Sequence, residues 1–159
     1  MVELGIVGGK NSGKTTLIEQ LVRYLGRHGK RVATIKHSSH SHRFDQPGKD
    51  SYRHREAGAG LTVVESDSEM AIYADPGKLD CARVQELTND KFDFWLVEGN
   101  RSADRPTVLL TRNLVDFSGP MPKKIVATFG PERVDTVSNH FDSEDVSGLG
   151  RFITESIIG

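Results

Sequence analysis

The chain has 159 residues, 36% hydrophobic and 27% charged, and its 21 Lys and Arg nearly balance 22 Asp and Glu. This length and composition predict one globular domain over residues 1–159 and exclude disordered and collagen-like chains. No run approaches the ~20 apolar residues of a membrane span, and the net charge of -1 argues against a general nucleic-acid binder. We therefore expect neither a membrane nor a nucleic acid as a partner, and the single cysteine, Cys81, favours the cytoplasm.

Apolar runs separated by turns predict strands that alternate with helices. Strands are expected at residues 2–7, 31–36, 92–97, 107–111 and 125–128. Helices are expected at residues 15–27, from about residue 50, at 79–87 and at 143–158, and residues 61–65 and 69–73 read as a hairpin. Such alternation predicts a three-layer α/β fold, with a mainly parallel sheet, helices on both faces and an added β-hairpin.

A phosphate loop joins the first predicted strand to the first helix. Residues 8–15, GGKNSGKT, match the pattern GxxxxGK[ST] in full, which makes the fold one of the P-loop NTPase type. Gly8 and Gly13 permit the backbone to bring consecutive N–H groups to phosphate oxygens. Lys14 is expected to reach the outer phosphates, and the Thr15 hydroxyl to bind Mg²⁺. The other nucleotide-binding residues expected in the loop are Asn11, Ser12 and Thr16, whereas Lys10 is expected to be solvated.

An acidic residue stands where the third core strand ends. The apolar run before Glu98 predicts that this carboxylate lies at the carboxyl edge of the sheet, beside the phosphate loop. A carboxylate there can organise the Mg²⁺ shell and the attacking water. We therefore expect Lys14 and Glu98 to be catalytic, Thr15 and Glu98 to bind the metal, and the N–H of Gly99 to face a phosphate.

A basic stretch follows the phosphate loop in the chain. Residues 27–55 hold eight Lys and Arg against two Asp, a local charge of +6, and five of the six histidines. Because the stretch follows the second strand, it is expected to open beside the phosphate loop and to receive a second anion or a partner. The residues expected to do so are Lys36, His37, Lys49 and Arg53. Two further roles stay open here: a metal site at His37, His40 and His42, and assistance to Mg²⁺ from Asp45 or Asp50.

The hairpin carries an apolar set of side chains. Its members are Val63, Val64, Met70, Ile72 and Tyr73. We expect these strands to lie at a sheet edge, where an apolar surface is a pairing site unless it is covered. The hairpin therefore favours a symmetric homodimer.

Four segments form a pattern over about the first 100 residues. They are GKTTLI at 13–18, IKH at 35–37, DQPGKDSYRH at 45–54 followed by AGA at 57–59, and VEG at 97–99. In this pattern the chain resembles the molybdopterin-guanine dinucleotide biosynthesis adapter family, MobB. Asn100 and Arg101 depart from it, because the family usually has an aromatic residue and a lysine there.

The resemblance implies a GTP-binding, weakly hydrolysing homodimer that uses Mg²⁺. Its partners would be molybdopterin or the guanylyltransferase that attaches GMP to the molybdenum cofactor. The residues alone leave two other classes open. One is a small-molecule kinase, with the basic stretch as its lid, and the other is a metallochaperone GTPase, although Cys81 lacks the neighbouring histidine of such proteins. The choice between GTP and ATP rests on the resemblance, because the guanine-selective [NT]KxD pattern is absent.

Overall fold

The computed structural model describes residues 1–38, 43–101, 103–117 and 120–157. The chain forms two compact units, one of Met1–His37 with Asp90–Gly159 and one of Ser38–Asn89. That the whole chain acts as a single domain stays a prediction. Within the described ranges, no helix is long and apolar enough to cross a membrane.

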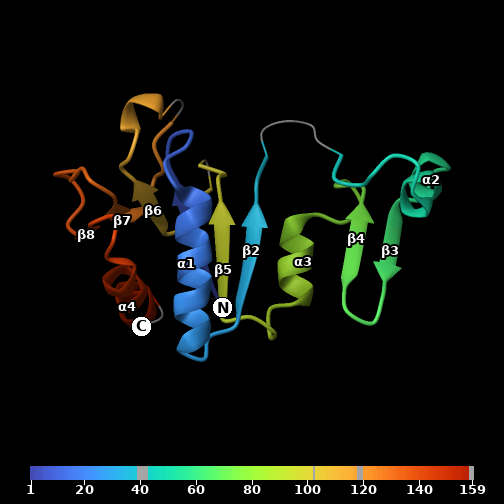
Figure 1. Cartoon of the computed structure of the whole chain (residues 1–159), viewed down its shortest axis with the longest axis horizontal. Coiled ribbons are helices and arrows are strands. Elements are labelled where there is room, and N and C mark those ends of the chain that lie inside the picture. Colours follow the sequence, from blue (N-terminus) through green and yellow to red (C-terminus); the bar gives the residue numbers. More distant parts are fainter. Residues whose placement is uncertain (39–42, 102, 118–119, 158–159) are drawn as a thin grey trace. The chain divides into compact units, whose positions relative to one another are not determined.

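The first unit is built on a six-stranded sheet in which every neighbouring pair is parallel. Its strands are β1 (Val2–Val7), β2 (Val32–Lys36), β5 (Phe94–Glu98), β6 (Thr107–Leu110), β7 (Ile125–Phe129) and β8 (His140–Phe141), in the order β2-β5-β1-β6-β7-β8 (Figure 1). The α/β fold with a mainly parallel sheet is confirmed. The strand β8 and the short 3₁₀ helix η1 (Leu114–Asp116) have no counterpart among the expected elements, because two or three residues are too few to show periodicity.

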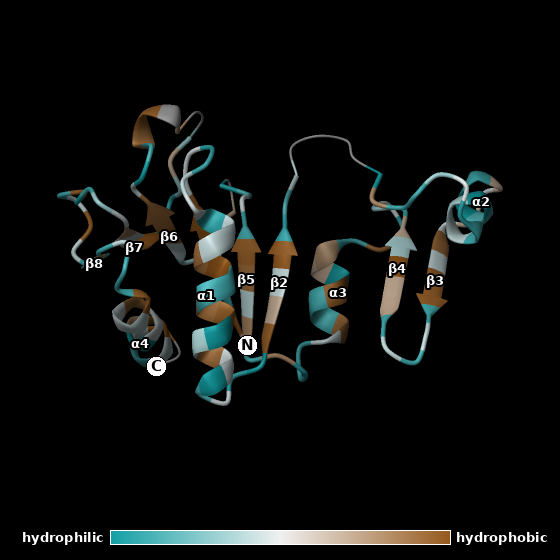
Figure 2. Ribbon diagram, viewed as in Figure 1, coloured by the Kyte–Doolittle hydropathy of each residue, from teal (hydrophilic) through white to brown (hydrophobic). Residues whose placement is uncertain are grey.

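The core of this unit lies between the sheet and two helices, α1 (Lys14–Arg27) and α4 (Val146–Ser156). Alternate strand residues point into it, for example Leu4 and Ile6 of β1. The helices contact each other and share this one cluster, so they cover the same face of the sheet. Figure 2 shows the match, with apolar central strands behind an α1 that alternates between polar and apolar stripes.

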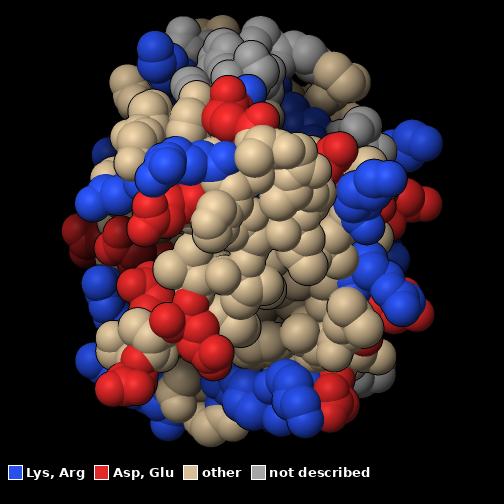
Figure 3. All heavy atoms as spheres, turned by 90° about the vertical axis from the view of Figure 1, so that its right-hand side faces the viewer, with Lys and Arg blue, Asp and Glu red and all other residues tan. Residues whose placement is uncertain are grey.

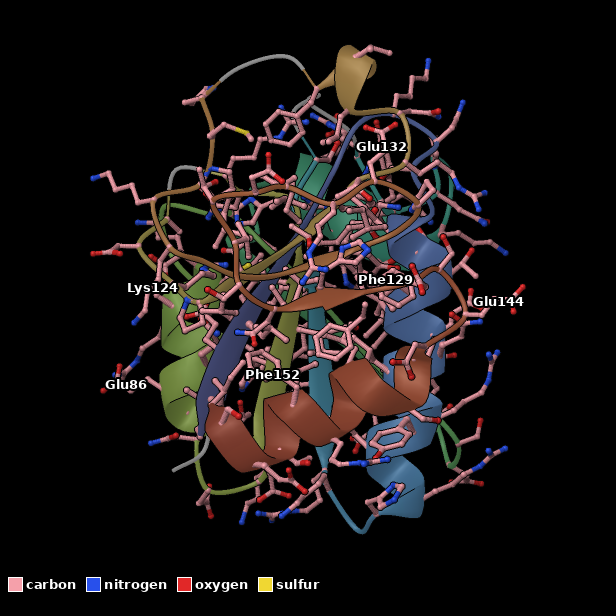
Figure 4. The ribbon with its side chains drawn as sticks, turned by 90° about the vertical axis from the view of Figure 1, so that its left-hand side faces the viewer. Glu86, Lys124, Phe129, Glu132, Glu144 and Phe152 are labelled. Carbon is pink, nitrogen blue, oxygen red and sulfur yellow. The ribbon has the colours of Figure 1, made fainter. Side chains whose placement is uncertain are left out.

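Helix α4 packs closely on α1 at Gly150. This glycine is buried, and a Cβ at its position would overlap the ring of Tyr24 in α1. The carboxylate of Asp145 caps the helix by accepting a hydrogen bond from the N–H of Gly148 at 2.8 Å. Figure 4 shows Phe152 on the side of α4 that faces the sheet, where its ring centroid lies 5.7 Å from that of Phe141.

The second unit contains α2 (Asp50–Glu56), the hairpin strands β3 (Leu61–Glu65) and β4 (Met70–Ala74), and α3 (Cys81–Leu87). The expected hairpin is present, with Val63 opposite Ile72 and Val64 opposite Ala71. Because side chains alternate between faces along a strand, the expected apolar set is divided. Val63, Met70 and Ile72 share one face with Leu61, whereas Val64 and Tyr73 lie on the other.

The close approach of α4 to α1 predicts opposite effects for two glycine substitutions. Gly150→Ala is expected to destabilise the protein by about 1 to 3 kcal/mol, because the added methyl group forces Tyr24 or the helix to move. Gly26→Ala is the matched control: it lies in α1 with nothing within 4 Å of its added Cβ, and should stabilise by about 0.5 to 1 kcal/mol. Urea unfolding of the two variants measures both free energies, and equal midpoints would contradict the packing described here.

Candidate functional site

The candidate site lies where three parallel strands end side by side. Ile6 of β1, Glu98 of β5 and Lys36 of β2 are register partners across the sheet. The strand order also reverses direction here, since the chain passes from β1 outward to β2 but from β5 to β6 on the other side of β1. In open α/β sheets, ligands bind outside the carboxyl ends of the strands at such a point.

The phosphate loop depends on three special backbone positions. Gly13 adopts φ 95° immediately before α1, and Asn11 adopts φ 56°, a conformation that asparagine tolerates better than most residues. Gly8 is needed for a different reason, because a Cβ there would come within 2.9 Å of the Cβ of Leu110. Helix α1 begins at Lys14, one residue before the expected range, so its N-terminal N–H groups open toward the loop.

The amine of Lys14 is folded back onto the loop. Nζ donates to the carbonyl oxygen of Gly9 at 2.6 Å and to that of Gly8 at 3.3 Å, with the Ser12 hydroxyl at 3.5 Å. The pKa of Lys14 lies below its ordinary value, chiefly because of partial burial. The nearby charge of Glu98 opposes this shift, and the charges of Arg101 and Lys36 add to it. The loop therefore holds a cation at its centre by contacts with carbonyl oxygens, which are weaker acceptors than a phosphate.

The carboxylate of Glu98 lies beside the first turn of α1. The alternation that buries Phe94 and Leu96 against the helices turns Glu98 to the same side of the sheet. Its two oxygens therefore lie 3.3 and 3.4 Å from the donating hydroxyl of Thr15, and Oε1 lies 3.6 Å from Lys36 Nζ. A hydroxyl and a carboxylate are the hard oxygen ligands that Mg²⁺ prefers, so this pair fits the expected metal.

The chain turns sharply after Glu98. Gly99 and Asn100 both adopt left-handed conformations, with φ 85° and 50°. The N–H of Gly99 donates to the carbonyl oxygen of Ile6 at 3.1 Å, so this geometry does not offer it to a phosphate. The side chain of Asn100 lies 3.3 Å from Nε2 of His37, which ties the end of β5 to the end of β2.

This turn brings Arg101 to the phosphate loop, a position that the sequence pattern left unassigned. One guanidinium nitrogen donates to the carbonyl oxygen of Gly8 at 3.3 Å, and the group lies 4.0 Å from the ring centroid of Phe117. The available sequence signal was its place three residues after Glu98, at the same edge of the sheet. No local sequence pattern indicated the contact between Arg101 and the Phe117 ring, because Phe117 follows a different strand.

The basic stretch is largely paired within the two units. In the first unit, Lys36 pairs with Glu98 and Arg31 with Asp93. In the second unit, the ion pairs are Arg43 with Glu56, Arg53 with Asp50 and Arg55 with the buried Asp45. Five of the eight cations therefore already face a carboxylate. The local charge of +6 overstated the unpaired charge, because three of the partners, Glu56, Asp93 and Glu98, lie outside the stretch.

The remaining predicted residues of the second unit lie around α2. Lys49 precedes this helix and, with Asp45 and His54, borders a hollow of about 740 Å³ between α2 and the hairpin. The carboxylate of Asp45 accepts a hydrogen bond from Ser51 at 2.9 Å, which indicates a structural role. Among the described residues, no three His, Cys, Asp or Glu side chains form a metal cluster. His40 and His42 of the proposed metal site lie outside these residues.

A smaller hollow, of about 150 Å³, adjoins the phosphate loop on the side away from β2. Gly13 and Thr16 form one wall, and residues after β6 and β7 form the other. Its remaining lining includes Ser12, Leu17, Gln20, Leu110, Arg112, Phe129, Gly130 and Ser143. The lining combines apolar side chains, among them Leu17 and Phe129, with polar ones such as Gln20 and Arg112.

The parallel sheet and the loop between β1 and α1 define an α/β protein of the phosphate-loop type. The family model of molybdopterin guanine dinucleotide synthesis protein B, MobB, matches residues 3–129. The chain therefore belongs to the MobB family.

Relatives in this family match most of the chain. The molybdopterin-guanine dinucleotide biosynthesis adapter protein of Haemophilus influenzae is 37% identical over 140 residues, which cover 83% of this chain and 77% of that protein. The Escherichia coli protein of the same name is 33% identical over 164 residues, covering 96% and 91%. A crystal structure of molybdopterin-guanine biosynthesis protein B superposes with a TM-score of 0.74 at 25% identity, covering 99% of this chain and all of that one.

Proposed function

We propose that this protein is a GTP-binding, weakly hydrolysing adapter that assists guanylylation of molybdopterin. The observation that carries the proposal is the meeting of Lys14, Thr15 and Glu98 at the ends of β1 and β5, in a chain of the MobB family. The cytoplasm is the proposed location, and GTP, molybdopterin and its guanylyltransferase are the proposed partners.

Nucleotide binding would use the loop as follows. N–H groups of the loop and of the first turn of α1 donate to phosphate oxygens, and Lys14 exchanges its carbonyl contacts for the outer phosphates. Thr15 and Glu98 would hold Mg²⁺, which would supply positive charge to offset that of the phosphates. The hollow beside Gly13 and Thr16 would receive the base.

Hydrolysis would depend on Glu98. Its carboxylate accepts a hydrogen bond from a water molecule and orients the oxygen toward the γ-phosphorus. The water oxygen bonds to this phosphorus while the bond to the β,γ-bridging oxygen breaks, and that oxygen leaves with GDP and the bonding pair. The water protons end on the released phosphate and in solvent.

The phosphate-loop assignment predicts that Lys14→Ala abolishes tight binding of GTP without unfolding the protein. The variant removes a charge that contacts only loop carbonyls and a hydroxyl, not the core. Lys10→Ala is the matched control, since it removes an exposed lysine of the same loop. Calorimetric titration with GTP, ATP and their diphosphates in Mg²⁺ measures the effect. Unchanged affinity in Lys14→Ala would exclude the loop as the binding site.

The adapter role predicts a higher yield of the dinucleotide when GTP is limiting. Purified protein is added to a guanylyltransferase, molybdopterin and GTP, and the yield is compared for wild type, Lys14→Ala and Lys10→Ala. We expect wild type and Lys10→Ala to raise the yield and Lys14→Ala to lose the effect. Equal yields with and without wild-type protein would contradict the adapter role, and phosphate transfer to a small acceptor would favour the kinase.

The second anion or partner contact is assigned to four residues in two places. Lys36 and His37 lie at the end of β2, and Lys49 and Arg53 lie at α2. In the same assay, a Lys49→Ala/Arg53→Ala variant separates partner contact from GTP binding. It should keep the affinity for GTP and lose most of the gain in yield, because its substitutions lie outside the phosphate loop. An unaltered yield would remove these two residues from the partner surface.

The homodimer is proposed to form through one face of the hairpin. Leu61, Val63, Met70 and Ile72 share this face and are 52, 51, 58 and 48% exposed. Figure 3, which views the molecule from the side of the second unit, shows a broad uncharged area ringed by charged side chains. Such an apolar area on a two-stranded sheet favours burial against a second copy of the chain.

This assignment predicts that Val63→Ser/Ile72→Ser converts a dimer into a monomer, because the two substitutions remove apolar contact area from the pairing face. Val115→Ser is the matched control, since Val115 is 96% exposed but lies in η1. Sedimentation equilibrium at micromolar concentration gives the masses. A monomeric wild type would refute the dimer, and a dimeric double variant would refute this face as its interface.

A further inference from the structure

Two cationic side chains converge on one carbonyl oxygen in the phosphate loop. Nζ of Lys14 and a guanidinium nitrogen of Arg101 each donate to the oxygen of Gly8 at 3.3 Å. Two like charges at one neutral acceptor repel each other at short range, and Lys14 has its shorter hydrogen bond to the carbonyl oxygen of Gly9, at 2.6 Å. An anion with several oxygens at this place would accept from both cations at once.

Three cations lie at this edge of the sheet. The side chains at the ends of β1, β2 and β5 are those of Lys14, Lys36 and Arg101. Glu98 at the same edge contacts Lys36 and the hydroxyl of Thr15. A highly charged anion bound here would therefore face all three cations.

The guanidinium of Arg101 is held in a defined orientation. Two consecutive left-handed residues, Gly99 and Asn100, turn the chain back after β5, and Asn100 is tied to His37. The guanidinium then lies 4.0 Å from the centre of the Phe117 ring. A planar cation over an aromatic face keeps its N–H groups directed outward from the plane's edge.

We propose that Arg101 contacts the terminal phosphate of the bound nucleoside triphosphate and makes the site prefer a triphosphate to a diphosphate. The inference rests on the proposed nucleotide binding and adds a residue to it. Lys14 serves the phosphates that the loop encloses, whereas Arg101 comes from the strand end that also carries Glu98, where the terminal phosphate must lie for hydrolysis. Its forked donors match two oxygens of one phosphate, which the single nitrogen of a lysine does not.

Phe117 is assigned as a positioning residue for Arg101. It lies after β6, beyond η1, and its ring lies against the guanidinium. A ring that holds the guanidinium in place would favour contact of Arg101 with the terminal phosphate.

The test compares affinities for a non-hydrolysable GTP analogue and for GDP, each with Mg²⁺. Arg101→Ala is expected to lower affinity for the analogue at least tenfold and to change affinity for GDP less than about threefold. Arg101→Lys, which keeps the charge without the fork, should lie between. Arg23→Ala, on the exposed side of α1, is the control and should match wild type.

A double-variant cycle tests Phe117. Phe117→Ala should lower affinity for the analogue less than Arg101→Ala does, and combining the two should add nothing to Arg101→Ala alone. A merely structural effect of Phe117 would instead add to it and would lower GDP affinity as well. Unfolding midpoints are measured alongside, and Arg101→Lys carries the comparison if Arg101→Ala does not fold.

Three outcomes overturn the proposal in distinguishable ways. If wild type prefers the analogue and Arg101→Ala keeps that preference, Arg101 has no contact with the terminal phosphate. If Arg101→Ala weakens the analogue and GDP equally, its role is to hold the loop at Gly8. If wild type binds neither nucleotide, the proposed function fails and this inference fails with it.

Discussion

The parallel register of β5 between β1 and β2 is the constraint on which the site depends. It aligns Ile6, Glu98 and Lys36 across three strand ends. The alternation that buries Leu96 against α1 also turns Glu98 toward Thr15, at the start of that helix. A slip of one residue in β5 would turn Phe94 and Leu96 away from the helices and move the carboxylate to the far face of the sheet. Core packing and site chemistry are therefore specified by the same pattern.

Left-handed backbone at two loops completes the arrangement. Asn11 and Gly13 shape the phosphate loop, and Gly99 with Asn100 reverses the chain after β5. A left-handed conformation costs an ordinary residue about 1 to 2 kcal/mol, less where the residue is glycine or asparagine. Glycine and asparagine occupy all four positions. The second turn brings Arg101 to Gly8. The backbone at the end of β5 therefore places a side chain against the loop that follows β1.

The parts of the site that the sequence predicted are those that depend on neighbouring residues. The phosphate loop, the start of α1 and the place of Glu98 at a strand end follow from contiguous patterns, and the structure has them there. Contacts between distant segments gave no such signal. Arg31 pairs with Asp93 across 62 positions and lowers the pKa of that carboxyl to about 2, which removes one cation from the basic stretch.

The fold shows the same division between local and distant information. Two short runs on either side of a turn predicted the hairpin, but its apolar residues had to be assigned to two faces before a pairing surface could be defined. The two-residue β8 forms only because β7 offers its edge, since a pair of residues carries no strand pattern of its own. Likewise, the stacking of Arg101 on Phe117 joins loops after two different strands, and only the completed sheet brings those strand ends together.

Three cations lie together at one edge of the sheet in a chain whose net charge is only -1. Long-range attraction of such a chain to polyanions is weak, so selectivity for the proposed anion would come from short-range contacts at this edge. The side chain of Lys36 is 69% exposed and can turn from Glu98 to solvent. Lys14 and Arg101 donate to loop carbonyl oxygens, which are weaker acceptors than a phosphate. The proposed anion could therefore bind these cations while the packing of Leu4, Ile6 and α1 beneath them stays as it is.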